Sequence, residues 1–463
     1  MSTTFHDPIE RILDLIEQTR FEDLPAEAVE AATVFFLDTV GVACAGRMAP
    51  KLDDLLSAAS RWGSGGDAVL WNQSRRVPAP VAALVNGYQC HALEYDCVYE
   101  PGVILPTAPL LAALMTKVDE LVAAGRSPSG RDLLRAFVVG LEVSCTLSAA
   151  TRQAMFFFRP ATTGVFSGLA ALACLDRLPR EQLRHAFGIA YSQVCGPMQA
   201  HEEGSMMLAM QMGFAARNAV QAHDMAKVGL TAPVEILGGR FGFFRNFEDG
   251  GELQQALAEM TKHWKVTQLS HKPFPSGRVT HGVIHALHQL RQELGLSPEQ
   301  ALEQVSAIHV DLPPLGFRLV GRPMVHQPAP NYARLSIAYV AAAELVFGRV
   351  DPTSFTTECL HDARVETLGR RVHTAEKPHP NPNAFYPQTL RLELADGRSL
   401  ERQIPHAWGH PLMPLSPLER EDKFRLCWRL TRQSGPAMEE AIAWLKQLPT
   451  QTELGPLVQL LAG

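Results

Sequence analysis

The chain is poor in charged residues for its length. Charged residues make up 19% of its 463 residues and hydrophobic residues 46%, with a net charge of −6. This composition indicates a large buried interior and favours burial of surface against a second copy, so we expect an oligomer. The Lys and Arg residues form no basic stripe, which argues against nucleic acid as a partner.

Signals for export and for membranes are also missing. The first residues lack a basic start and an apolar middle, and no stretch of about 18 uncharged apolar residues occurs. The eight cysteines contain no CxxC pair and lie in apolar contexts, which is typical of reduced thiols. We therefore expect a cytoplasmic protein without a membrane partner.

Several familiar catalytic motifs are absent. The sequence has no GxGxxG after a strand, no GxxxxGK[ST], no GxSxG and no HExxH. Histidines and carboxylates do not complete a set of four metal ligands at a recognisable spacing. These absences argue against the chemistries that the motifs carry and against dependence on a metal.

The hydrophobic pattern predicts a mainly α protein with a smaller α+β part. Residues 1–267 show helical spacing almost throughout, and helical spacing returns in 405–463. Residues 268–404 contain strand-like runs at 307–312 and 389–394, the second followed by an Asp-Gly turn and a further run. We expect a large helical domain made from both ends of the chain and an α+β lid domain between them.

A first polar cluster lies in an apolar stretch and contains His91, Glu94, Asp96 and Tyr99. Buried polar groups cost about 1–3 kcal/mol each without a partner, so such a cluster favours a reaction site. The alternative interpretation is a helix cap beside a core histidine.

Two further clusters flank predicted core helices. Arg159 precedes a helix start, where free backbone N–H groups favour an anion; it is equally well explained as a surface residue covering an aromatic run. His201 and Ser205 stand just before a methionine-rich run that includes Met207. Methionines at that density usually fill a core, but here they could also line a pocket.

A fourth cluster marks the expected boundary between the domains. Lys272, Arg278 and His281 lie in a proline-rich turn. Because ligand sites favour domain junctions, this cationic turn is a candidate for binding a carboxylate or for acid–base work. The alternative is an exposed basic linker.

Several segments, taken in order along the whole chain, resemble the MmgE/PrpD family. The segments that carry the resemblance are Phe36–Gly41, Asn86–Gly87, His91–Asp96, Glu203–Ser205, Lys272–Pro275 and Ser336–Tyr339. The family includes 2-methylcitrate dehydratase, cis-aconitate decarboxylase and iminodisuccinate epimerase. The resemblance implies a helical domain, a lid domain, a homodimer and a cofactor-free site between the domains.

The chain departs from the family pattern at the positions that handle charge. Glu94 stands where the family usually has Asp, and Leu105 and Arg159 stand where it has histidines. A lysine expected four residues after Gly204 is Leu208, whereas Lys272 is kept. Because each charge-assisted contact is worth about 1.5–3 kcal/mol, these losses argue against an unaltered tricarboxylate substrate.

We therefore predict a divergent lyase, isomerase or cyclase that acts next to a carbonyl or carboxylate of a relatively apolar substrate, in biosynthesis of a specialised metabolite. The catalytic candidates are Glu94, Asp96, Lys272, His201 and Tyr99. The substrate-binding candidates are Arg159, His91, Ser205, Met207, Leu208, Leu105, Arg278 and His281.

Two other interpretations remain open from the sequence. One is a dehydratase or decarboxylase of a dicarboxylate or tricarboxylate such as 2-methylcitrate or cis-aconitate, with Arg159, Arg278 and His201 in place of the lost cations. The other is an inactive binding or scaffold protein. The surviving Glu94, Asp96 and Lys272 count against inactivity, because apolar replacements would stabilise a dead site.

Overall fold

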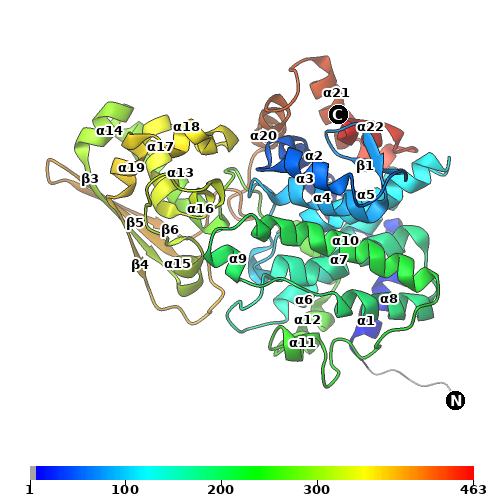
Figure 1. Cartoon of the computed structure of the whole chain (residues 1–463). Helices are drawn as coiled ribbons and strands as arrows, with labels where there is room; N and C mark the ends of the chain where they lie inside the picture. Colours follow the sequence, from blue (N-terminus) through cyan, green and yellow to red (C-terminus); the bar gives the residue numbers. More distant parts are fainter. Residues whose placement is uncertain (1–6) are drawn as a thin grey trace.

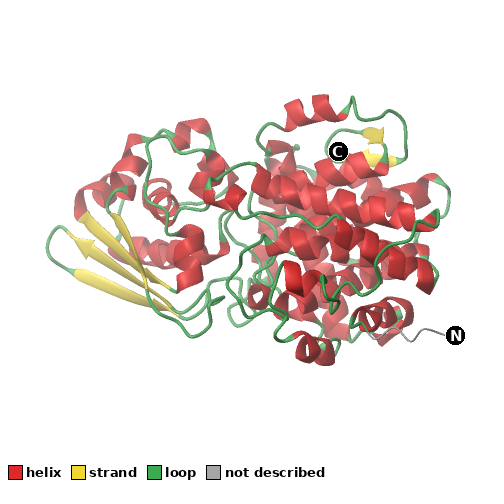
Figure 2. Ribbon diagram, turned by 60° about the horizontal axis from the view of Figure 1, so that its bottom comes forward, coloured by secondary structure: helices red, strands yellow, loops and turns green. Residues whose placement is uncertain are grey.

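The computed structural model describes residues 7–463 and shows two lobes (Figure 1). The larger lobe is helical, and the smaller one carries the main sheet at its outer edge, with helices beside it (Figure 2). Each lobe has its own set of packed apolar side chains. The predicted mainly α fold with a smaller sheet-containing domain is confirmed.

The larger lobe is built from both ends of the chain. Its N-terminal helices are α1 (Ile9–Gln18), α2 (Ala26–Ala45), α3 (Leu52–Ala59), α4 (Ala79–His91), α5 (Thr107–Ala123), α6 (Gly130–Ala149), α7 (Arg159–Asp176), α8 (Arg180–Ser192), α9 (Gln199–Glu202), α10 (Met207–Lys227), α11 (Phe243–Asn246) and α12 (Leu253–Glu259). Its C-terminal helices are α20 (Pro417–Arg429), α21 (Pro436–Lys446) and α22 (Gly455–Ala462), which pack on α2 and α5 (Figure 1). A short hairpin of β1 (Ala68–Leu70) and β2 (Arg75–Val77) interrupts the helical pattern and was not predicted.

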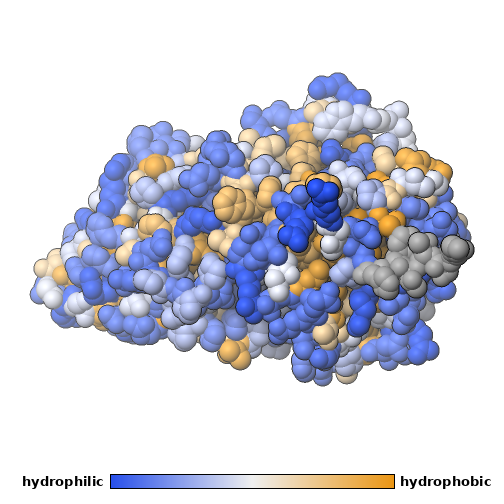
Figure 3. Space-filling view, turned by 90° about the horizontal axis from the view of Figure 1, so that it is seen from below, coloured by the Kyte–Doolittle hydropathy of each residue, from blue (hydrophilic) through white to orange (hydrophobic). Residues whose placement is uncertain are grey.

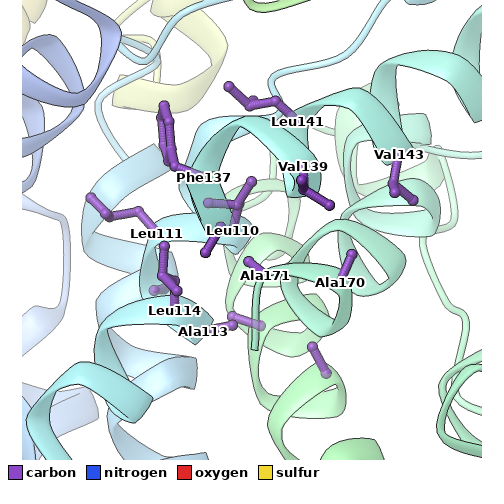
Figure 4. Packing of buried hydrophobic residues seen from close by; sticks show 14 of the residues in the cluster. Leu110, Leu111, Ala113, Leu114, Phe137, Val139, Leu141, Val143, Ala170 and Ala171 are labelled. Carbon is purple, nitrogen blue, oxygen red and sulfur yellow. The ribbon is translucent and has the colours of Figure 1, made fainter. Parts of the chain in front are cut away.

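Local sequence explains where several of these helices begin and how they pack. Ser416 accepts a hydrogen bond from the backbone N–H of Glu419, whose carboxylate accepts one from Ser416, so this capping box begins α20. Helices α4 and α10 cross with backbones in contact, because a Cβ on Gly87 would lie 2.8 Å from the Cα of Gly213. The core shared by α5, α6 and α7 interlocks leucines and phenylalanine with alanines (Figure 4).

The smaller lobe pairs helices with a four-stranded sheet. Its elements are α13 (His281–Leu294), α14 (Pro298–Gln304), β3 (Val305–Leu312), α15 (Pro314–Val320), α16 (Pro330–Arg334), α17 (Ile337–Phe347), α18 (Thr357–Leu360), α19 (Ala363–Gly369), β4 (Val372–Glu376), β5 (Gln388–Leu394) and β6 (Ser399–Ile404). The strand order is β4-β3-β5-β6, with β3 and β4 parallel and the other pairs antiparallel. The strand runs predicted at 307–312 and 389–394 are confirmed, and Gly397 turns the β5–β6 hairpin with a φ of +88°.

One helical stretch, Ala26–Met48, has the length and hydropathy of a membrane span, but 78% of its most apolar window is buried in the structure. It packs against α20 and α6, so it is weak evidence for a membrane contact. Seen from below, the surface is largely hydrophilic with scattered apolar residues (Figure 3). Single exposed apolar residues are usual on proteins and support no particular interface.

A buried ion pair joins the two ends of the chain. Lys423 of α20 lies 2.7 Å from the carboxylate of Asp38 in α2 and donates a hydrogen bond to the backbone carbonyl of Tyr95. Burial raises the pKa of Asp38, and the charge of Lys423 opposes this rise. The Lys423 ammonium therefore stabilises both the contact between α2 and α20 and the position of the segment that follows α4.

We expect Lys423→Met to lower the free energy of unfolding by about 3–5 kcal/mol, because it leaves the Asp38 carboxylate buried without a partner. Urea unfolding followed by circular dichroism measures this loss. The control is Lys262→Met, which removes an exposed ion pair with Glu259 and should change stability by less than about 0.5 kcal/mol. The double variant Asp38→Leu/Lys423→Met should recover part of the loss; equal destabilisation by both single lysine variants would contradict the assignment.

Candidate active site

A cavity lies where the two lobes meet. It encloses about 550 Å³ of empty space, including the part open to solvent. Its lining consists of Glu94, Val98, Val103, Leu105, Met155, Phe158, Pro160, His201 and Leu208 from the larger lobe and of Lys272, Gly277, Arg278, Val279, Leu319, Val320, Leu335 and Phe385 from the remainder. Only four of these residues carry charged or ionisable groups, so the cavity is apolar with one polar region.

Glu94 stands in a strained turn after α4. Its φ is +53°, a left-handed conformation that is uncommon for a residue with a side chain. The backbone N–H of Glu94 donates to the carbonyl of His91, and Lys272 Nζ donates to the carbonyl of Glu94 over 3.1 Å. Strain of this kind costs on the order of 1–3 kcal/mol and persists where surrounding contacts hold it, often at functional sites.

Lys272 also forms an ion pair with the side-chain carboxylate of Glu94. Its Nζ lies 2.8 Å from Glu94 Oε2, and the lysine side chain is only 1% exposed. Backbone hydrogen bonds in both directions between Val98 and Ser270 hold the segment that carries Lys272 against the turn that carries Glu94. The structure thus brings together the retained ammonium and the first of the two predicted acids.

A second carboxylate lies behind Glu94. His91 Nδ1 is 2.9 Å from Asp96 Oδ1, and His91 Nε2 is 3.2 Å from Glu94 Oε1, although this second contact is not aligned as a hydrogen bond. Neither His91 nor Asp96 is exposed, and neither lines the cavity. The result is a chain of alternating charge: Lys272, Glu94, His91 and Asp96.

The pKa values follow from this arrangement. Burial alone would lower the pKa of His91, but the charges of Asp96 and Glu94 and the hydrogen bond to Asp96 raise it to about 10. Burial would likewise raise the pKa of Glu94, but Lys272 and His91 hold it well below its usual range. At neutral pH the turn therefore holds an imidazolium and an ionised Glu94.

Arg278 lies in the cavity wall with its donors already engaged. Its Nε is 2.7 Å from Glu100 Oε1, and its Nη atoms donate to the backbone carbonyls of His271, Ala407 and Trp408. Leu105 and Leu208, which the resemblance predicts to stand in place of a histidine and a lysine, line the same cavity. These two positions thus present hydrocarbon to the cavity.

Arg159 occupies a different place from the one predicted. It is the first residue of α7, and Phe158 and Pro160 on either side line the cavity while Arg159 does not. Its Nε lies 2.9 Å from Glu248 Oε1, and its other nitrogens donate to Gln153 and Asn383. An arginine with all three nitrogens engaged does not fit the role of a replacement cation for the substrate.

Four other candidates also lie outside the lining. Met207 is 44% exposed, so the interpretation of it as pocket wall is replaced by that of a surface residue. Ser205 accepts a hydrogen bond from the backbone of Met207 near the start of α10. Tyr99 is buried in the core of the larger lobe, where burial raises its pKa. His281 is buried against Phe274 and the carbonyl of Ser276, and burial lowers its pKa well below the usual value.

The lid residues of the cavity were missed from the sequence. Leu319, Val320, Leu335 and Phe385 close the apolar side, and each stands in a stretch that reads as ordinary core. Arg322, which contacts His201, was missed as well. Nothing in their local pattern distinguishes a residue facing a cavity from one facing another side chain. Within residues 7–463, no group of three or more His, Cys, Asp or Glu side chains is placed to hold a metal ion.

Comparison with known families now identifies the fold. The MmgE/PrpD N-terminal domain matches residues 10–256 and the MmgE/PrpD C-terminal domain matches residues 274–446. The chain belongs to the MmgE/PrpD family, as the resemblance predicted. The second match includes α20 and α21, which pack in the larger lobe, so the sequence domains do not coincide with the lobes.

Individual relatives point to one kind of reaction. Cis-aconitate decarboxylase of Mus musculus is 27% identical over 97% of this chain and 94% of that protein. Cis-aconitate decarboxylase of Homo sapiens is 27% identical over 95% and 91%. Cis-aconitate decarboxylase-like protein oryM of Aspergillus oryzae is 25% identical over 97% and 96%. These relatives support a lyase-type enzyme.

The raised pKa of His91 predicts how stability depends on pH. A folded-state pKa of about 10, against about 6.5 in an unfolded chain, gives stability that is complete below pH 6.5 and lost as the pH rises toward 10. We expect the stability difference between the wild type and His91→Gln to shrink over that interval. Urea unfolding at fixed pH values measures it, with the exposed His361→Gln as control. A difference that stays constant from pH 6 to 10 would contradict the charged state of His91.

Proposed function

We propose that the protein is a lyase or isomerase that performs acid–base chemistry, without a cofactor, next to a carboxylate or carbonyl of a relatively apolar substrate. The observation that carries this proposal is the contact of 2.8 Å between Lys272 and Glu94 in the wall of an apolar cavity. A cyclase of specialised metabolism would use the same groups. Homodimeric assembly and a cytoplasmic location stay predictions.

Because of its ion pair with Lys272, Glu94 becomes an effective base only when a substrate is bound. While Lys272 is paired with it, Glu94 is a weak base because its pKa is held low. A substrate carboxylate that binds Lys272 Nζ takes this partner away, so the pKa of Glu94 rises and its carboxylate can remove a proton from the neighbouring carbon. The charge that then develops on the substrate oxygens is stabilised by the ammonium.

His91 and Asp96 support this step without touching the substrate. The imidazolium lies between the two carboxylates, so it keeps Glu94 oriented toward the cavity when Lys272 turns to the substrate. Asp96 in turn holds the proton on His91. We therefore assign Glu94 and Lys272 as catalytic residues and His91 and Asp96 as positioning residues.

A second candidate function is decarboxylation of cis-aconitate, which the names of the relatives favour. A tricarboxylate needs several cations to bind its three carboxylates. Among the lining residues named above, the cationic ones are Lys272 and Arg278, and Arg278 is already paired with Glu100. Unpaired carboxylates against leucine and valine would cost several kcal/mol each. The cavity chemistry therefore favours the first candidate.

We expect Glu94→Gln and Lys272→Ala each to lower turnover by about 10²- to 10⁴-fold, the usual contribution of a general acid or base. The assay follows exchange of solvent deuterium into the carbon next to the carboxylate of alkyl-substituted monocarboxylic and dicarboxylic acids, by proton NMR. Cis-aconitate is assayed in parallel through loss of its absorbance.

The matched control is Lys262→Ala, which removes an exposed lysine far from the polar region and should leave turnover unchanged. Exchange that persists in both site variants would exclude the assigned base and ammonium. Turnover of cis-aconitate, with no exchange in the alkyl acids, would favour the second candidate instead.

A further inference from the structure

His201 and Arg322 connect the two lobes at the edge of the cavity. His201 belongs to α9 of the larger lobe, and Arg322 follows α15 of the smaller one. Arg322 Nη2 lies 3.1 Å from His201 Nδ1 and also donates to the backbone carbonyl of His201. This contact was not foreseen from the sequence, which suggested His201 as a proton carrier or as a replacement for a lost cation.

The contact fixes where the ring of His201 holds its proton. A guanidinium has only N–H donors and stays protonated, so His201 Nδ1 must be the acceptor. The proton of the neutral ring is then on Nε2. Protonation of Nδ1 would break this hydrogen bond and place an imidazolium against the guanidinium.

The surroundings also keep the ring neutral. Burial, and then the charge of Arg322, lower the pKa of His201 to about 4, with a smaller contribution from Arg318. Glu94 and the backbone carbonyl of Leu319 act in the opposite direction but do not outweigh them. Lys272 faces the same cavity and adds a further positive charge. Above about pH 5 the ring is therefore neutral. It can donate a hydrogen bond through its N–H group, but it has no imidazolium proton to transfer to the substrate.

The residue that carries this donor lies in the wall of the cavity. His201 lines it together with Lys272 and Glu94 and is 5% exposed. Its Nε2 atom is buried and makes no aligned hydrogen bond to any of residues 7–463, the nearby carbonyl of Leu319 included. A buried N–H without a partner is costly, and an oxygen atom of a bound substrate would satisfy it.

We propose that His201 donates a hydrogen bond from Nε2 to a carboxylate or carbonyl oxygen of the substrate, and that Arg322 is the positioning residue that sets this tautomer. The substrate class rests on the function proposed above, whereas the tautomer depends only on the contact with Arg322. When a proton leaves the neighbouring carbon, negative charge moves onto that oxygen, and a donor already in place stabilises it without moving.

The tautomer can be tested without any substrate. The full-length protein is labelled with ¹⁵N-histidine, and the His201 signals are assigned by their loss in His201→Gln. We expect the wild type to show a neutral ring protonated on Nε2 from pH 8 to pH 5.5. An imidazolium at pH 6, or a ring protonated on Nδ1, would overturn the proposal.

Two arginine variants separate positioning from general electrostatics. Arg322→Met removes both the charge and the donor to Nδ1, so we expect a mixture of tautomers and a raised pKa of His201. Arg318→Met is the matched control, because Arg318 donates to the carbonyl of Met155 and makes no hydrogen bond to the ring. It should leave the tautomer unchanged. An unchanged tautomer in Arg322→Met would show that Arg322 does not set it.

The role in catalysis has its own readout. In the deuterium exchange assay we expect His201→Ala to lose about 10²- to 10³-fold in turnover, as for the loss of one oxyanion donor, and His201→Gln, which keeps a side-chain N–H, to lose at least tenfold less. The wild-type rate should show no titration of His201 between pH 5.5 and 8. Equal losses in both variants would contradict a donor role. Failure to find any substrate would count against the proposed function, while the NMR result would still decide the tautomer.

Discussion

The ion pair between Lys272 and Glu94 is the contact on which the rest of the site depends. It joins the segment that leads into the smaller lobe to a strained turn at the end of α4, and it is almost entirely buried. A buried charge is tolerated only with a partner, and here each member of the chain from Lys272 to Asp96 has one. Opposite charges alternate along the four groups, so the chain adds no net charge to an apolar interior.

The replacement of aspartate by Glu94 fits this geometry. The residue has left-handed backbone dihedrals, and its carboxylate contacts both His91 and Lys272. The additional methylene gives the side chain the reach to bridge an imidazole on α4 and an ammonium from another segment. Lys423, which holds the carbonyl of Tyr95, fixes the next residue from the opposite side. The turn is therefore held by Lys272, from the segment that leads into the smaller lobe, and by Lys423 of α20.

The fold was predictable because its helices and strands follow from sequence patterns that extend over only a few neighbouring residues. Helical spacing, the Asp-Gly hairpin turn and alternating burial in β5 each depend on neighbours a few residues away. Strand β4 was missed because none of its side chains is buried and its sequence, VHTAE, does not alternate regularly between apolar and polar residues. Glu94 and Lys272 stood out as charges in apolar or proline-rich stretches. Arg159 and Met207 were assigned to the cavity because the sequence shows that a residue is near a site and not which way its side chain points.

Membership of the family predicts the fold of this chain, but it does not predict which side chains line the cavity. The chain has the family's two domains, and its cavity is lined by Leu105 and Leu208, where the resemblance predicts a histidine and a lysine in other members. A leucine side chain has no hydrogen-bond donor and also excludes water. A carboxylate beside it would therefore lose both a hydrogen bond to the protein and its hydration. An alkyl group in the same place would gain burial, worth about 0.8 kcal/mol for each methylene. In the function proposed above, these two leucines direct the binding energy of the cavity toward hydrocarbon, and Glu94 and Lys272 supply the polar region of its lining.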